Sequence, residues 1–231
     1  MSNLPGHINS IVQNRREIER LLEIHSQIAG SSPGKKHDVE VLNKSSIVLL
    51  VACWEAYIED LADAAFDHLL ANARSPQQIP NKVLTMASKS LRSDQDELRV
   101  WDLAQDGWKS VLQDHREAVK DKYTGKLNTP RPKQIDLIFE QMLGLKAVSS
   151  KWNWQGASNE NVIKRLEDLV TLRGQIAHRV STSESVKKFQ VEQNVTLIGY
   201  LSTKLSNQVR QHLQTVTRRT PWSSIRYKSV A

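Results

Sequence analysis

Two residues whose chemistry suits phosphate groups, Arg173 and His178, lie five positions apart in the segment LVTLRGQIAHRV. The planar guanidinium of arginine donates several hydrogen bonds to phosphate oxygens, and histidine exchanges a proton near neutral pH. Together they could bind a phosphate group and exchange a proton beside it. Five positions turn a side chain by about 140° around an ideal helix. The pair therefore converges only across a groove, through a distortion near the helix end, or across a two-fold axis between two chains.

Arg173 also has unusual neighbours for a charged residue. Apolar residues recur at spacings of three and four in this segment and form one stripe that includes the position of Arg173: Val162, Ile163, Leu166, Leu169, Val170, Ile176 and Ala177. No carboxylate stands three or four positions from Arg173. One interpretation is a buried ion pair with Glu55, and the other is a cleft in which Arg173 binds a phosphate. The two can coexist, with Glu55 orienting an arginine that acts on substrate.

Several helices must position these residues, because long segments lack the glycine and proline that would interrupt them. We expect a first helix at about 5–29, a short helix at 81–91 and a polar helix at 94–123. Ser181 and Glu184 have the spacing of a capping box and predict the start of the last helix. The core helices are expected at about 38–73, 134–145, 159–179 and 183–217. The sequence thus predicts one all-α domain over 1–217, with an insertion at about 76–130.

Charge and composition favour an anionic partner. The formal net charge is +7, and the segment 218–231 is basic and contains no acidic residue. Such a C-terminal tail is more often a solvated, frayed end than a binding arm.

The chain carries one cysteine, Cys53, which excludes an intramolecular disulfide framework and a cysteine-rich metal site. The histidines other than His178 show no ligand spacing with cysteine or carboxylates, so no metal and no cofactor is expected. The longest apolar run, 47–54, is too short to cross a bilayer, and the first residues do not resemble a secretory signal. We therefore expect a cytoplasmic protein.

The string RGQIAH, from Arg173 to His178, resembles the R-x4-H motif of the HEPN superfamily. The earlier stretch LLVACWEAYIEDLADAAF resembles the helix that packs against the motif helix in the RiboL-PSP-like branch of that superfamily. The resemblance covers the second helix and the residues from about 134 to 217. It implies an all-α, HEPN-type helical bundle with a helical insertion. Many members carry a polar residue directly after the arginine, where this chain has Gly174, and Gln175 is the candidate to supply the missing hydrogen bond.

The resemblance implies a metal-independent endoribonuclease that acts as a homodimer with a composite active site. His178 would exchange protons with the RNA and Arg173 would stabilise the transition state, leaving a 2′,3′-cyclic phosphate. It further suggests prokaryotic defence or a toxin–antitoxin-like system with a restraining partner protein. Two alternatives stay open. One is a non-catalytic HEPN dimer that binds RNA or protein, and the other is a helical scaffold in which Arg173 simply pairs with Glu55.

Residues near the motif could add RNA contacts. Arg179, Lys187 and Lys188 could hold phosphates. Trp152 and Trp154, in the segment KWNWQG, could stack on an unpaired base. The competing interpretation is that both tryptophans cover the hydrophobic core beneath a loop.

Overall fold

The computed structural model describes residues 4–29, 39–93, 96–124, 130–179, 185–227 and 230. Regular structure in these ranges is helical, apart from one isolated bridge between Trp154 and Ala157. The α-helices are α1 (Gly6–Ala29), α2 (Glu40–Asn72), α3 (Asn81–Ser93), α4 (Gly107–Val119), α5 (Pro132–Leu143), α6 (Asn159–Arg179) and α7 (Lys188–Thr217). Short helical turns are η1 (Pro76–Gln78), η2 (Glu97–Leu103), η3 (Lys120–Thr124) and η4 (Val148–Lys151). The prediction of an all-α fold is confirmed.

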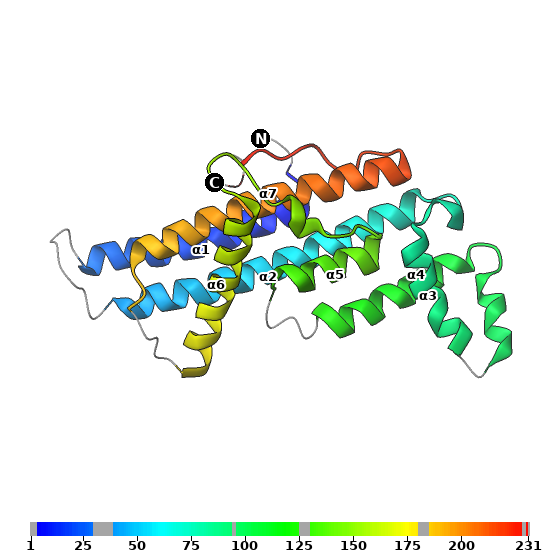
Figure 1. Cartoon of the computed structure of the whole chain (residues 1–231), viewed down its shortest axis with the longest axis horizontal. Helices are drawn as coiled ribbons and strands as arrows, with labels where there is room; N and C mark the ends of the chain where they lie inside the picture. The colour runs from blue at the N-terminus through cyan, green and yellow to red at the C-terminus, as the bar shows by residue number, and fades with distance from the viewer. Residues whose placement is uncertain are drawn as a thin grey trace.

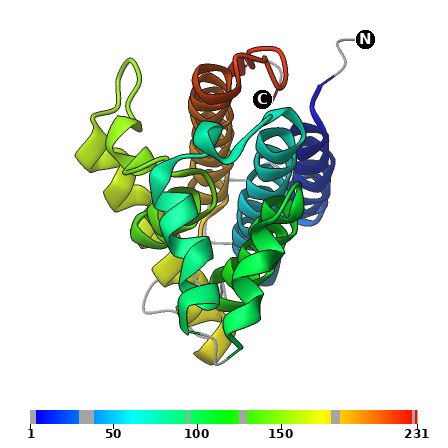
Figure 2. The same ribbon diagram turned by 90° about the vertical axis from the view of Figure 1, so that its right-hand side faces the viewer.

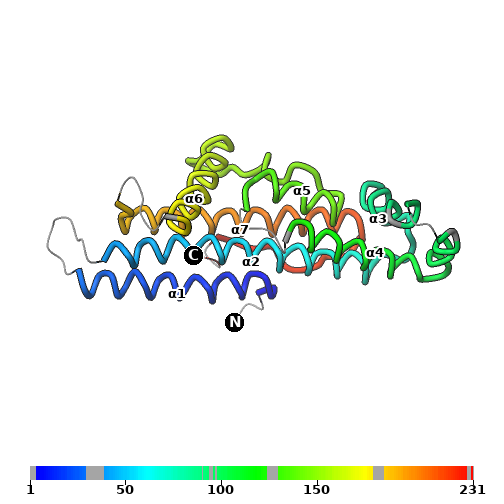
Figure 3. The backbone as a smooth tube through the Cα atoms, turned by 90° about the horizontal axis from the view of Figure 1, so that it is seen from below, coloured from blue at the N-terminus to red at the C-terminus, as the bar shows by residue number. Residues whose placement is uncertain are grey.

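Helix α2 is the centre of the bundle and contacts α1, α5, α6 and α7. It lies between the long helices α1 and α7, which run beside it (Figures 1 and 2). Helix α6 crosses this layer steeply, on the side opposite α1 (Figures 1 and 3). Large side chains of α2, among them Trp54, Tyr57 and Phe66, are fully buried. Because other helices enclose α2, it buries residues on several faces rather than along one stripe.

By length and composition, α2 is the one described helix that could also cross a membrane. A core helix passes the same test, and the contacts of α2 with four other helices are those of a core helix.

The predicted core helices are present, with small changes at their ends. Helix α6 spans 159–179 as predicted, and α2 and α5 begin or end within two residues of the predicted limits. Helix α7 begins at Lys188, later than the predicted 183. Ser181 and Glu184 lie outside the described residues. Instead, the side-chain oxygen of Gln190 accepts a hydrogen bond from the backbone N–H of Lys187 (2.8 Å) and satisfies a donor at the start of the helix.

The prediction of one continuous helix over 94–123 is wrong. The chain forms η2, turns, and then continues as α4 and η3. A Cβ atom at Gly107 would lie 1.9 Å from the carbonyl oxygen of Asp102, so this turn requires glycine. Gln105, just before it, has a positive φ of 53°. Local backbone geometry therefore interrupts a sequence whose composition is compatible with helix.

The tail after α7 packs on the bundle, so the expectation of a frayed end is also wrong. Arg210 donates from Nε to the carbonyl of Trp222 (2.8 Å), and Asn207 exchanges hydrogen bonds with the backbone of Ile225. Ile225 is buried, and Tyr227 stacks on Tyr200 of α7. Burial of these apolar groups offsets the conformational entropy lost when the tail is ordered.

Candidate functional site

Arg173 and Glu55 come together where α6 packs on α2. Both side chains are half-buried. Burial raises the pKa of the Glu55 carboxyl, whereas the positive charge of Arg173 lowers it and the neighbouring Glu59 raises it further. The net direction is a raised pKa, so desolvation outweighs the attraction between the two groups. Arg173 and Glu55 are thus close enough to interact electrostatically, and a direct ion pair between them stays a prediction.

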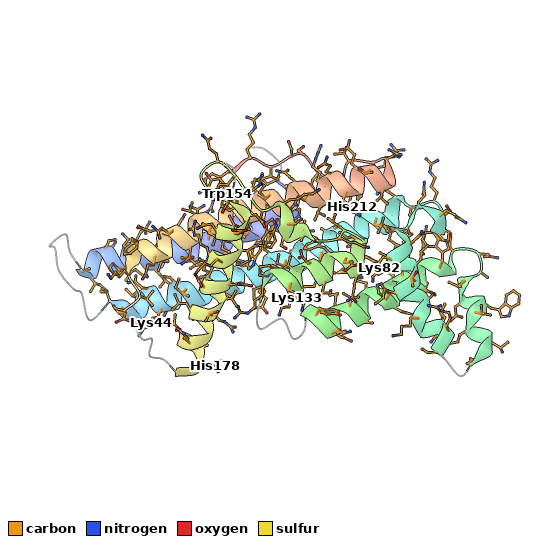
Figure 4. All side chains as sticks on the ribbon, in the orientation of Figure 1. Lys44, Lys82, Lys133, Trp154, His178 and His212 are labelled. Carbon is orange, nitrogen blue, oxygen red and sulfur yellow. The ribbon has the colours of Figure 1, made fainter. Side chains whose placement is uncertain are left out.

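His178 lies in the last turn of α6 and is exposed. Figure 4 places it at the end of α6 that projects beyond the long helices. Ala177 and Gln175 are also exposed, so the buried stripe ends at Ile176. Arg173 thus faces α2 while His178 faces solvent, as their angular separation on an ideal helix implies.

Gly174, between the two motif residues, has no heavy atom within 4 Å of the place where a Cβ would lie. A side chain could therefore be accommodated there without displacing a neighbour.

Trp152 is a core residue. Its relative exposure is 0%, and its indole meets that of Trp54 edge-on, with ring centroids 6.4 Å apart at 73°. No face of Trp152 is open to a base, which favours the core interpretation for this residue. Trp154 is half-buried and stacks on Tyr200 at 4.8 Å and 11°. This loop is held to the first turn of α6, where Asn159 donates to the carbonyls of Ser149 and Trp152.

The predicted cations differ in their surroundings. Lys187 is exposed, with its ammonium 6.0 Å from the Phe189 ring. Lys188 donates to the hydroxyl of Ser26 on α1 (2.7 Å) and lies 3.6 Å from Glu192, so it also links α7 to α1. Arg179 is the last residue of α6, and its side chain lies outside the described part of the chain.

Sequence reasoning missed Arg131, a further cation beside the motif helix. It precedes the first turn of α5, and its guanidinium donates to the hydroxyl of Thr171 on α6 (3.0 Å), two positions before Arg173. The indole N–H of Trp54 donates to the carbonyl of Pro130, the residue before Arg131 (3.4 Å). No sequence spacing relates these residues, because the packing of α5 on α2 and α6 brings them together.

Two other kinds of site are relevant elsewhere in the described ranges: metal sites and cavities lined by the motif residues. Within the described ranges, no group of three or more His, Cys, Asp or Glu residues could hold a metal ion. Cavities of about 430 Å³ and 320 Å³ lie between α1 and α7 and between α3 and α4, and neither is lined by Arg173 or His178. The arrangement therefore defines an all-α bundle with a partly buried arginine and an exposed histidine on one core helix.

The chain matches the model of the RiboL-PSP-HEPN family over residues 9–211, and it belongs to this family. The match includes the 76–130 region as well as the motif helix. HEPN domains generally bind RNA and often dimerise, which supports a ribonuclease-like or RNA-binding module. A search of curated proteins and a search of solved structures found no match.

Proposed function

We propose that the protein is a metal-independent endoribonuclease of HEPN type, with Arg173 and His178 as catalytic residues. The observation that carries the proposal is their placement: one helix places Arg173 within electrostatic range of Glu55 and presents His178 to solvent in the next turn. A carboxylate near Arg173 can orient its guanidinium before substrate binds, and the exposed side chain of His178 is accessible to a phosphodiester.

In the proposed reaction, the RNA 2′-hydroxyl attacks the adjacent phosphorus as a histidine takes its proton. The bond to the 5′-oxygen breaks, and that oxygen receives a proton from a second acid. The products are a 2′,3′-cyclic phosphate and a 5′-hydroxyl. Arg173 stabilises the additional negative charge of the transition state.

One chain contributes a single motif histidine, so a homodimer whose two copies of His178 face a shared groove would supply both the base and the acid. The orientations of Arg173 and His178 support this composite site, because the two side chains of one protomer diverge.

The test is RNA cleavage by purified protein in the presence of EDTA, beside Arg173→Ala and His178→Ala. We expect the parent to leave cyclic phosphate ends and both variants to be inactive. Arg92→Ala, at an exposed arginine of α3, is the matched control and should cleave normally. Equal cleavage by the parent, Arg173→Ala and His178→Ala would refute the proposal, because the activity would then come from elsewhere.

Gly174 supports one alternative, a non-catalytic HEPN dimer that binds RNA or a protein. Because the site has room for a side chain, Gly174→Asn can restore a polar group next to Arg173 without a clash. A parent that binds RNA but does not cleave it, and a Gly174→Asn variant that does cleave, would favour this alternative and identify the missing group.

We also propose a cytoplasmic role in prokaryotic defence or in a toxin–antitoxin-like pair, where a partner protein restrains RNA cleavage. Expression of the parent without a partner should arrest bacterial growth, whereas His178→Ala should not. Equal growth with the two proteins, at equal expression, would argue against a toxic ribonuclease.

A further inference from the structure

One face of α7 is covered by the segment that connects α5 to α6. The segment runs antiparallel to α7, as three contacts demonstrate: His212 donates to the carbonyl of Leu143 (2.8 Å), Gln208 donates to the carbonyl of Val148 (3.1 Å), and Tyr200 stacks on Trp154. The α7 residues in these contacts are spaced by eight and four positions, so their side chains spread over about 120° of the helix circumference. Figure 4 labels the two ends of this path, Trp154 and His212.

At one end of the path, three aromatic rings stack in parallel. Tyr200 lies 4.8 Å from Trp154 and 3.8 Å from Tyr227, with interplanar angles of 11° and 3°. All three residues are half-buried, so each keeps some exposure to solvent. Asn153 and Gln155, on either side of Trp154, are exposed and offer amide groups beside the stack. Parallel rings with neighbouring amides match the way unpaired bases are commonly bound.

The two segments that supply the stack carry cations and no carboxylates. Neither the 143–157 segment nor the chain from 193 to 227 contains Asp or Glu. The two segments contain seven cations: Lys146, Lys151, Lys204, Arg210, Arg218, Arg219 and Arg226. The carboxylate packed against the connecting segment is that of Asp136, and both of its oxygens accept hydrogen bonds from Ser149. These two segments therefore contribute only positive formal charges to this surface.

Beyond the stack, the same path contains a polar cavity of about 240 Å³. Its lining includes two exposed lysines, Lys146 and Lys151, together with Gln208, Gln211 and His212. No acidic residue lines it. Ammonium and amide donors around a small cavity suit a phosphate group.

We propose that this aromatic–basic face, defined by Trp154, Tyr200, Tyr227, Lys146 and Lys151, binds unpaired RNA. Bases extend the aromatic stack, and backbone phosphates lie against the two lysines and the polar cavity. The inference rests on the proposed ribonuclease function and deepens it, since the face is a substrate-docking site separate from the motif.

Trp154 precedes the N-terminal end of α6, whereas His178 is in its last turn, and a helix of 21 residues is about 30 Å long. An RNA that contacts both the aromatic–basic face and His178 would therefore need its unpaired segment to lie about 30 Å from the cleaved bond.

The experiment measures binding of a short, unstructured, fluorescent RNA to the full-length His178→Ala protein, which would not cleave it. Lys146→Ala combined with Lys151→Ala should weaken binding and lower the slope of log affinity against log salt by about 1.4, the value for two phosphate contacts on a single strand. Trp154→Leu should weaken binding about 5- to 150-fold, whereas Trp154→Phe, which keeps an aromatic ring, should retain most of the affinity. The matched charge control is Lys89→Ala with Lys109→Ala, on α3 and α4.

Unchanged affinity and salt dependence in the Lys146/Lys151 variant would overturn the proposal, as would an equal loss in the Lys89/Lys109 control. Because both lysines are exposed, this result does not depend on the folding of the tryptophan variants. Tighter binding of single-stranded DNA or of duplex RNA would overturn the assignment to unpaired RNA, and failure of any nucleic acid to bind would favour an acidic protein as the partner.

Cleavage by the parent protein is scored separately from binding. If the parent cleaves RNA but the lysine variant binds it normally, the proposed role of the aromatic–basic face is wrong and the ribonuclease proposal stands. If RNA binding depends on the aromatic–basic face but the parent does not cleave RNA, the ribonuclease proposal fails and the proposed role of this face stands.

Discussion

The two ends of α6 are built differently. At the N-terminal end, Trp152 is fully buried, Asn159 ties the preceding loop to the helix, and Trp154 stacks on α7. At the C-terminal end, Arg173 is half-buried and His178 is exposed. The first end is stabilised by contacts within one chain, whereas at the second end Arg173 faces α2 and His178 faces solvent. The N-terminal end therefore anchors the helix, and the motif end leaves His178 accessible, as the proposed composite site requires.

The largest expected effect is on activity at the motif end. His178→Ala should lower the rate of RNA cleavage by about 100- to 10,000-fold, the usual contribution of an acid or base group. The melting temperature should change little, because the side chain is exposed. Cleavage kinetics and thermal melts on one preparation check both statements. A large loss of stability in His178→Ala would contradict the view that the C-terminal end of α6 contributes little to the stability of the fold.

Trp152→Ala should give the opposite result at the N-terminal end. Removal of this buried indole should lower the free energy of unfolding by about 3–5 kcal/mol, through lost burial and the cavity left beside Trp54. Denaturant unfolding measures the change. The matched control is Trp101→Ala, at an exposed tryptophan of η2, which should stay within about 0.5 kcal/mol of the parent. Similar losses in the two variants would mean that Trp152 is not a core anchor.

Asn159→Ala should destabilise the protein by about 1–3 kcal/mol, because two carbonyl groups, of Ser149 and Trp152, lose their donor. The neighbouring, exposed Asn161→Ala serves as the control in the same unfolding measurement. Catalysis by the folded fraction of Asn159→Ala should be normal. A specific loss of activity would show that the two ends of α6 are coupled.

Gly174→Ala should stabilise the protein by about 0.5–1 kcal/mol. Glycine inside a helix costs conformational entropy, and the added Cβ meets no atom within 4 Å. Denaturant unfolding at several protein concentrations checks the gain. Destabilisation instead would indicate that a second protomer packs closely against Gly174.

The smallest expected effect concerns pH at Glu55. Its pKa is raised in the folded protein, chiefly by burial, so the folded state favours the protonated carboxyl. The corresponding stability is present below the ordinary pKa of 4.5 and is lost as the pH rises through the raised value. Glu55→Gln remains neutral, so the parent should lose stability relative to it as the pH increases. The reverse trend, in unfolding measurements from about pH 4 to about pH 7, would mean that attraction to Arg173 outweighs desolvation.

Much of the fold was predictable from local patterns. Helical spacing of apolar residues located α6 and the other core helices, and the residues RGQIAH indicated the family to which the chain belongs. The sequence also identified Arg173 and Glu55 as charged residues among apolar neighbours, which suggested that the two could interact. The helix positions and the motif depend on residues that are close in sequence, and the spacing of apolar residues reveals which face of a helix is buried.

The sequence by itself determined the all-α class, the helix that carries Arg173 and His178, and the positive charge of the C-terminal region. Tertiary structure alone decided that Trp152 is buried, that Arg131 approaches α6, and that the tail packs on α7 so that Tyr227 joins Tyr200 and Trp154. The reason is physical: helix periodicity is set by neighbours three and four positions away, whereas an aromatic stack or a helix crossing depends on how residues distant in sequence pack.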